Sequence, residues 1–98
     1  MDINVEELKE RLANKEALNI IDVREDWEYE EQNIGAKLIP LASLPQRIEE
    51  IEEWKEKEVI VHCRSGARSS QAQKYLQSQG FMHVRNLTGG IIKFLEKI

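Results

Sequence analysis

The chain has 98 residues and a mass of 11.4 kDa, which allows one compact domain and excludes a two-domain enzyme with its own cofactor-binding half. Charged residues make up 33% of the chain and hydrophobic residues 41%, a balance that favours a packed core over disorder. The formal net charge of -4 argues against nucleic acid and anionic lipid as partners. We therefore expect a single domain over residues 1–98.

No apolar run in the sequence approaches the roughly 20 residues that a membrane-spanning helix needs. The N-terminus carries Asp2, Glu6 and Glu7, whereas a secretory signal begins with basic and then apolar residues. Both observations predict a cytoplasmic protein without a membrane partner.

The first half of the chain predicts helices and strands in alternation. Asn4 is expected to cap the first helix, because Glu7 three residues later completes a capping box. A branched apolar run then predicts a buried parallel strand, and Asp26 can cap the short acidic helix that follows it. In chain order, we expect a helix from Val5 to near Asn14, a strand over 18–23, a helix over 27–31, a strand over 37–39 and a helix that includes Leu44, Ile48 and Ile51.

The second half continues the alternation. Gly80 and Phe81 are expected to end a helix with an apolar contact back toward Leu76. The expected elements are a strand over 58–61, a helix that Ser69 and Ser70 cap, a strand over 82–87 and a final helix that includes Ile91, Ile92, Leu95 and Ile98. This alternation predicts a three-layer α/β sandwich around a parallel sheet. Ligands of such sheets bind at the carboxyl ends of the strands, where Cys63 lies.

Cys63 is the only cysteine, which excludes an internal disulfide, a C-x-x-C redox pair and a multi-cysteine zinc site. His62 and His83 are the only histidines, so the sequence predicts neither a metal site nor a cofactor. Cys63 is then either a small buried hydrophobic residue or a lone nucleophile.

The residues after Cys63 favour the nucleophile. The segment Cys63–Arg68 (C-R-S-G-A-R) stands between a buried strand and a helix, where backbone N–H groups can curl around an anion and Gly66 allows the tight curve. Those donors, the helix dipole and the guanidinium groups of Arg64 and Arg68 favour the thiolate. We therefore expect the pKa of Cys63 to lie below the roughly 8.5 of a free thiol. A thiolate in such a cradle is a nucleophile for an anionic substrate.

Loop length separates two chemistries that use such a cradle. Cysteine phosphatases place five residues between the cysteine and the arginine that binds phosphate, whereas four residues separate Cys63 from Arg68. The smaller cradle fits one sulfur atom carried on Cys63 as a persulfide. Loop length and the lack of a second cysteine disfavour a small cysteine phosphatase or an arsenate reductase.

Three motifs carry a family resemblance that covers nearly the whole chain. Cys63–Ser69 (C-R-S-G-A-R-S) resembles the active-site loop of rhodanese-like sulfurtransferase domains, and Ile21–Glu25 (I-D-V-R-E) and Asn86–Ile91 (N-L-T-G-G-I) resemble two further motifs of that family. The resemblance implies an α/β fold with a five-stranded parallel sheet, a catalytic Cys63 and a persulfide intermediate. The loop residues that we expect to surround the substrate are Arg64, Ser65, Gly66, Ala67, Arg68 and Ser69.

We therefore expect a single-domain sulfurtransferase. Cys63 would take sulfane sulfur from an anionic donor such as thiosulfate, or from the persulfide of another protein, and pass it to a thiophilic acceptor. Since the chain has no second cysteine, that acceptor must be external: cyanide, a thiol or a partner protein. The alternative is a non-catalytic regulatory or binding module that presents the same loop to a partner.

Residues outside the loop leave two interpretations open. Asp22 and Arg24 end a strand on the side of Cys63, where Arg24 could add positive charge or Asp22 could hold a loop arginine. An ordinary ion pair between the two fits equally well. His62 points to the opposite sheet face from Cys63 if the strand continues, which predicts a core histidine with satisfied hydrogen bonds. Trp27 is expected to be a packing residue.

Overall fold

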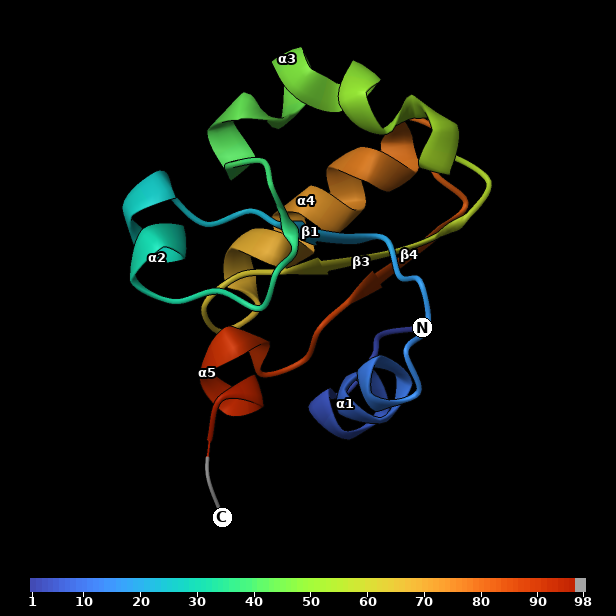
Figure 1. Cartoon of the computed structure of the whole chain (residues 1–98). Coiled ribbons are helices and arrows are strands. Elements are labelled where there is room, and N and C mark those ends of the chain that lie inside the picture. Colours follow the sequence, from blue (N-terminus) through green and yellow to red (C-terminus); the bar gives the residue numbers. More distant parts are fainter. Residues whose placement is uncertain (97–98) are drawn as a thin grey trace.

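Four parallel strands form the centre of the fold, with helices before and after each of them (Figure 1). The computed structural model describes residues 1–96. The strands are β1 (Ile20–Asp22), β2 (Lys37–Leu38), β3 (Glu58–His62) and β4 (His83–Asn86). The helices are α1 (Val5–Ala13), α2 (Asp26–Glu31), α3 (Leu44–Arg47), α4 (Ala67–Ser78) and α5 (Gly90–Phe94), with the 3₁₀ helices η1 (Leu41–Ser43) and η2 (Ile48–Trp54) on either side of α3.

The sheet has the order β2-β1-β3-β4, and every neighbouring pair of strands is parallel. The prediction of five strands is wrong, because in the fifth position Ile3 forms only a single bridge, to Leu87. Asn4 explains the difference: its side chain accepts a hydrogen bond from the Glu7 N–H at 2.8 Å and so begins α1 directly after Ile3. A strand in this position therefore ends at Ile3, where the helix cap begins.

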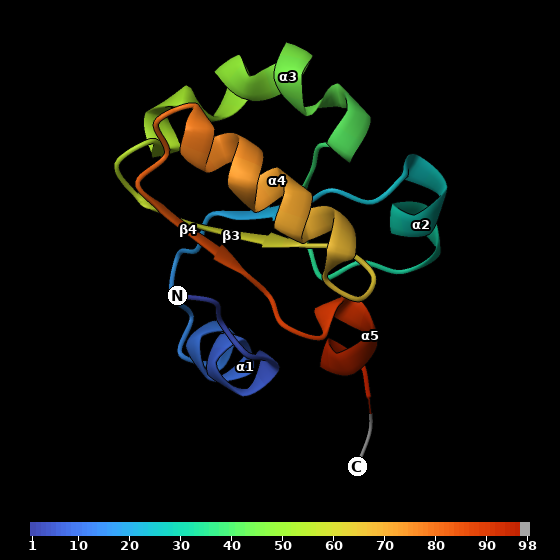
Figure 2. The same ribbon diagram turned by 180° about the vertical axis from the view of Figure 1, so that it is seen from behind.

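Two hydrophobic clusters lie on opposite faces of the sheet, which confirms the three-layer sandwich. The larger cluster includes Val61 of β3 and Leu76 of α4, and the smaller includes Ile60 of β3 and Leu8 of α1. Figures 1 and 2 show α3 and α4 on one side of the sheet and α1 and α5 on the other. Cys63 belongs to the larger cluster and is only 1% exposed.

Two elements differ from expectation in their local geometry. Asp26 begins α2 instead of capping it, and Glu25 is the cap, through reciprocal hydrogen bonds with Glu28 three residues later. The helix expected around Leu44 is a short α-helix between two 3₁₀ segments, with a non-helical break at Ile51. The segment is still amphipathic, because Leu44 and Ile51 are buried while Glu49, Glu50, Glu52 and Glu53 are exposed.

The ends of α4 and α5 can also be compared with the helix ends predicted from the sequence. The Phe81 N–H donates to the Leu76 carbonyl at 3.0 Å, which confirms how α4 ends. Helix α5 ends at Phe94, and the expected Ile98 lies outside the described residues. Within residues 1–96, no helix is long and apolar enough to span a membrane.

The start of α5 lies against the loop that follows β3. Ile91 and Ile92 donate their backbone N–H groups to the carbonyls of Cys63 and Arg64, at 3.0 and 3.2 Å. Gly90 allows this approach, because it has φ +62° and any Cβ on it would overlap the Arg64 carbonyl. A side chain at position 90 would push the loop and α5 apart.

Gly90→Ala should therefore lower the free energy of unfolding by about 2 kcal/mol or more, because the methyl group meets fixed backbone atoms in a strained conformation. Gly35→Ala is the matched control. Gly35 has φ +83°, but nothing lies within 4 Å of a Cβ there, so this variant carries the backbone strain alone. Urea unfolding of both variants measures the difference. An equal loss of unfolding free energy in the two variants would show that glycine is not required at position 90 for the contact between the loop and α5.

Candidate active site

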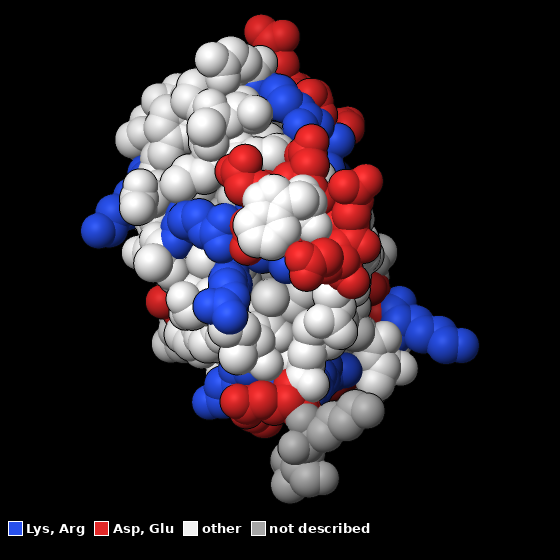
Figure 3. Space-filling model, turned by 90° about the vertical axis from the view of Figure 1, so that its left-hand side faces the viewer, with Lys and Arg blue, Asp and Glu red and all other residues white. Residues whose placement is uncertain are grey.

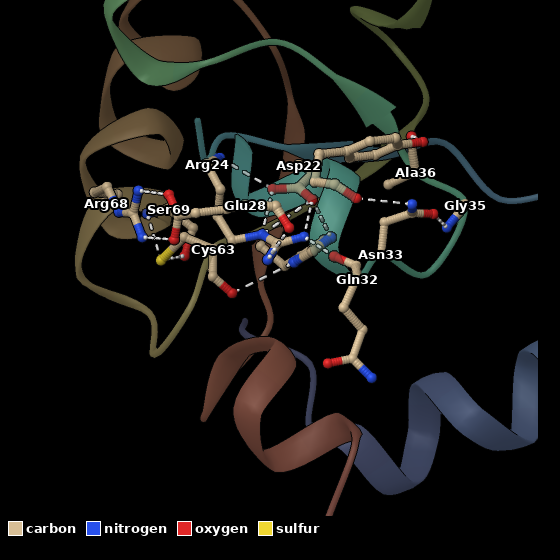
Figure 4. A network of polar contacts seen from close by, with 12 residues as sticks. Asp22, Arg24, Glu28, Gln32, Asn33, Gly35, Ala36, Cys63, Arg68 and Ser69 are labelled. Carbon is tan, nitrogen blue, oxygen red and sulfur yellow. Dashed lines mark hydrogen bonds and ion pairs between the residues drawn. The ribbon is translucent and has the colours of Figure 1, made fainter. Parts of the chain in front are cut away.

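The Cys63 sulfur is the centre of a small cradle of donors beyond the carboxyl end of β3. The N–H groups of Gly66 and Ser69 donate to Sγ at 3.1 and 3.3 Å, and the Ser69 hydroxyl lies 3.3 Å from it (Figure 4). Gly66 is the N-cap of α4 and has φ +115°, which turns the chain from the loop into the helix. The expected cap by Ser69 or Ser70 is therefore wrong, because Ser69 lies inside the first helical turn and faces the sulfur.

The pKa of the Cys63 thiol lies below its ordinary value. Burial alone would raise this pKa, but hydrogen bonds from the Ser69 hydroxyl and from the N–H groups of Ser69, Gly66 and Ser65 more than offset the effect of burial. The largest contributions that lower this pKa thus come from hydrogen-bond donors of the loop; the charges of Arg64 and Arg68, which were also expected to lower it, are not among them. A lower pKa increases the fraction of the thiolate, which is the nucleophilic form of cysteine.

Asn86, the last residue of β4, holds two groups of the cradle in place. The Ser69 hydroxyl donates to Asn86 Oδ1 at 2.6 Å, and Asn86 Nδ2 donates to the Gly66 carbonyl at 3.3 Å. A hydroxyl carries a single proton, so this proton can turn from Asn86 toward Sγ when Cys63 ionises. Asn86 is not among the site residues predicted from the sequence, although its place at the carboxyl end of a parallel strand is a signal that could have found it.

Arg68 forms an ion pair with Glu28 of α2 and lies close enough to Cys63 for their charges to interact. Two hydrogen bonds of 2.6 and 2.9 Å join the guanidinium to the carboxylate (Figure 4). The bond from Arg68 is the main cause that holds the pKa of Glu28 at about 2, against the opposing effect of burial. Glu28 lies 40 residues from Arg68 in the sequence, so no local pattern could have revealed this pair.

Asp22 and Arg24 form a buried ion pair with each other. Arg24 is 5% exposed, its Nη2 lies 2.7 Å from Asp22 Oδ2, and the same nitrogen donates to the Gln32 carbonyl at 2.8 Å. Among the described residues, Asp22 holds neither of the loop arginines. Of the two interpretations of Asp22 and Arg24, the geometry therefore supports the ordinary ion pair at the end of the strand. The hydrogen bond from Arg24 to Gln32 also connects the end of α2 to β1.

The remaining loop side chains lie at the surface. Arg64, Ser65 and Ala67 are exposed, and Arg64 forms no ion pair with any described residue. The loop therefore places its backbone around the sulfur and Arg64 outside it. Within residues 1–96, no cluster of three or more His, Cys, Asp or Glu residues could hold a metal ion.

His62 is fully buried and lies opposite Asp22 in the register of β1 and β3. Its Nδ1 is 3.4 Å from the Cys63 carbonyl, but its Nε2 has no hydrogen-bond partner among the described residues and lies 3.6 Å from Asp22 Oδ2. The expectation of a fully satisfied core histidine is therefore wrong. Burial lowers the pKa of His62 more than the Asp22 carboxylate raises it, so the imidazole is neutral at pH 7.

Ser69→Ala should raise the pKa of Cys63, because it removes the hydroxyl donor and keeps the backbone N–H. Wild-type protein should alkylate with a midpoint below the roughly 8.5 of a free thiol, and the variant should move toward that value, so its reactivity at neutral pH falls. Ser70→Ala is the control, since that side chain makes no bond to the sulfur. The pH profile of the iodoacetamide reaction measures all three proteins. An unchanged midpoint in Ser69→Ala would mean that the backbone alone sets this pKa.

Comparisons with known proteins agree with this fold. A sulfurtransferase of Allochromatium vinosum is 42% identical over 92 residues, which cover 93% of this chain and 84% of that protein. The putative sulfur carrier protein YrkF of Bacillus subtilis is 38% identical, and the match covers 92% of this chain but 48% of YrkF. The crystal structure of a rhodanese-like domain protein from Staphylococcus aureus matches with a TM-score of 0.84 and 30% identity, over 99% of this chain and 94% of that one. The family model of the rhodanese-like domain matches residues 4–97, and the chain therefore belongs to the rhodanese-like domain family.

Proposed function

We propose that the protein is a sulfurtransferase that carries sulfur as a persulfide on Cys63. The cradle is the observation that carries the proposal, because donors from Gly66 and Ser69 lie within 3.3 Å of Sγ. The outer sulfur of a persulfide would stand about 2 Å beyond Sγ, near the same loop dipoles. The sulfurtransferase among the relatives supports this activity.

The reaction has two half-reactions that need no electron carrier. The Cys63 thiolate first attacks the outer sulfur of thiosulfate, the sulfur–sulfur bond breaks, and sulfite leaves with the electron pair. A thiophilic acceptor such as cyanide then attacks the outer sulfur of the persulfide, and the Cys63 thiolate leaves with the electron pair of the broken bond. Each step moves one neutral sulfur atom between two nucleophiles, so the loop has only to hold negative charge.

Other proteins can take the place of thiosulfate and cyanide. A persulfide on a partner's cysteine donates sulfur in the same way as thiosulfate, and a thiol of a partner can accept it. The name of YrkF, a putative sulfur carrier, supports exchange with proteins. A single unpaired cysteine that must stay reduced also fits the reducing cytoplasm, where we propose that this chain works.

Cys63→Ser should abolish sulfur transfer from thiosulfate to cyanide, because serine keeps the size of the side chain and loses its nucleophilicity at neutral pH. Intact-protein mass spectrometry after thiosulfate treatment should show a thiol-reversible gain of one sulfur atom in wild type and in the control Ser70→Ala, and none in Cys63→Ser. Circular dichroism checks that the fold persists. Transfer by Cys63→Ser at the wild-type rate would remove Cys63 from the reaction. No sulfur gain in wild type would favour the non-catalytic binding module.

The size of the loop should exclude phosphate chemistry. Wild-type protein should not hydrolyse aryl phosphates, because Arg68 stands one residue too early for a phosphatase loop and is held by Glu28. One glycine inserted after Gly66 should widen the ring of donors, increase vanadate binding and weaken sulfur transfer. The same insertion after Gly35, in an exposed turn, is the control. Hydrolysis by wild type, or full sulfur transfer after the first insertion, would contradict this role of loop size.

A further inference from the structure

A cleft of about 840 Å³ lies beside the Cys63 loop, lined by residues of α2 and of the α5 region. Arg64 lines the cleft at the loop, while Trp27 of α2 and Ile92 of α5 supply apolar surface. Cys63 does not line the cleft, but Arg64 is its neighbour in the chain, so the cleft begins where the loop reaches solvent. A thiosulfate ion would fill only a small part of this volume.

The apolar side chains of this cleft are unusually exposed. Trp27 is 63% exposed, so the expectation that it is a packing residue is wrong, and Ile92 is 42% exposed. Large apolar side chains that face solvent in a cleft with a polar rim are typical of surfaces that bind another protein. Tryptophan is also the residue type most enriched where binding energy is concentrated.

The rim of the cleft along α2 is acidic. Two exposed carboxylates line the cleft, Glu31 of α2 and Glu96 after α5, and neither forms an ion pair with any described residue. The same helix α2 and its cap also carry the exposed carboxylates Glu25, Asp26 and Glu30. Figure 3 shows acidic side chains gathered around a patch without charged residues on this side of the molecule, with basic side chains next to it. Such a rim repels anionic partners and attracts basic ones.

We propose that this cleft docks a basic segment of a partner protein, and that this segment carries the cysteine that exchanges sulfur with Cys63. The proposal rests on the proposed function. Lysine or arginine side chains of the segment would face the acidic rim and Trp27, and its anionic persulfide would face Arg64. In the transfer, the Cys63 thiolate attacks the outer sulfur, the sulfur–sulfur bond breaks, and the partner's thiolate leaves with the electron pair.

Docking can be measured apart from chemistry in the Cys63→Ser protein. The probe is a fluorescent ten-residue peptide with one cysteine, one leucine and four lysines, and the matched peptide has four glutamates in place of the lysines. Fluorescence anisotropy should show saturable binding of the lysine peptide that weakens as salt rises, and no binding of the glutamate peptide. Adding Trp27→Ala should weaken binding at least about tenfold. Met82→Ala, which truncates a 65% exposed side chain outside the cleft, should not.

A pair of charge reversals tests the rim. Glu31→Lys with Glu96→Lys, at two carboxylates that line the cleft, should reduce binding of the lysine peptide at low salt more than Glu49→Lys with Glu53→Lys. Glu49 and Glu53 are exposed on η2, outside the cleft, so the second pair changes net charge equally. Equal losses in the two variants would assign the effect to net charge and overturn the docking site.

Three further outcomes would overturn the proposal: equal affinity for the two peptides, full affinity in Trp27→Ala, or self-association of the protein that Trp27→Ala abolishes. The last would show that a second copy of the chain covers the cleft. Thermal unfolding of each variant checks that it is folded. The thiosulfate–cyanide reaction of wild type separates the two hypotheses. If wild type transfers sulfur from thiosulfate to cyanide but the lysine peptide does not bind, the docking site is overturned and the proposed sulfurtransferase activity is retained.

Discussion

A negatively charged sulfur inside a protein needs dipoles that point at it, and the rest of this site follows from that need. The peptide groups after β3 can turn their N–H bonds toward Cys63 only if their carbonyls find partners elsewhere. The first amides of α5 bind the carbonyls of Cys63 and Arg64, and Asn86 binds that of Gly66. Gly90 permits this arrangement by having no side chain. The ends of two strands and the start of one helix therefore build the environment of a single atom.

The arginines near the sulfur mainly hold the surrounding elements together. Arg24 and Arg68 are each paired with a carboxylate, Asp22 and Glu28, before any substrate arrives. Their ion pairs and hydrogen bonds thus connect α2 to β1 and α4, while hydrogen bonds from the loop make the largest contributions that lower the pKa of Cys63. Hydrogen bonds in a buried cradle are screened little by salt, whereas exposed charges such as that of Arg64 act over a longer range and are screened. The reactivity of Cys63 should therefore depend little on ionic strength, whereas the rate of encounter with a charged partner should depend on it strongly.

The local parts of the site could be predicted from the sequence, and the long-range parts could not. Cys63, Gly66 and Ser69 lie in one short segment, where residue types and spacing reveal the cradle. Glu28 and Asn86 lie 40 and 17 residues from the side chains that they bind, and only the fold brings them together. A serine near the start of a helix also fits a cap, so its contact with the sulfur had to come from the structure. The strand count failed because the capping signal of α1 limits the strand before it.

The short outer strands of the sheet also affect the tendency of the protein to aggregate at high concentration. Strand β2 at one edge has two residues, carries the exposed Lys37 and is soon followed by Pro40, which has no N–H group. Beside β4, the other outer strand, Ile3 adds a single bridge. Few regularly spaced N–H and C=O groups are therefore presented to a neighbouring molecule. The short edge strands thus protect this parallel sheet, whose centre is apolar, from edge-to-edge aggregation.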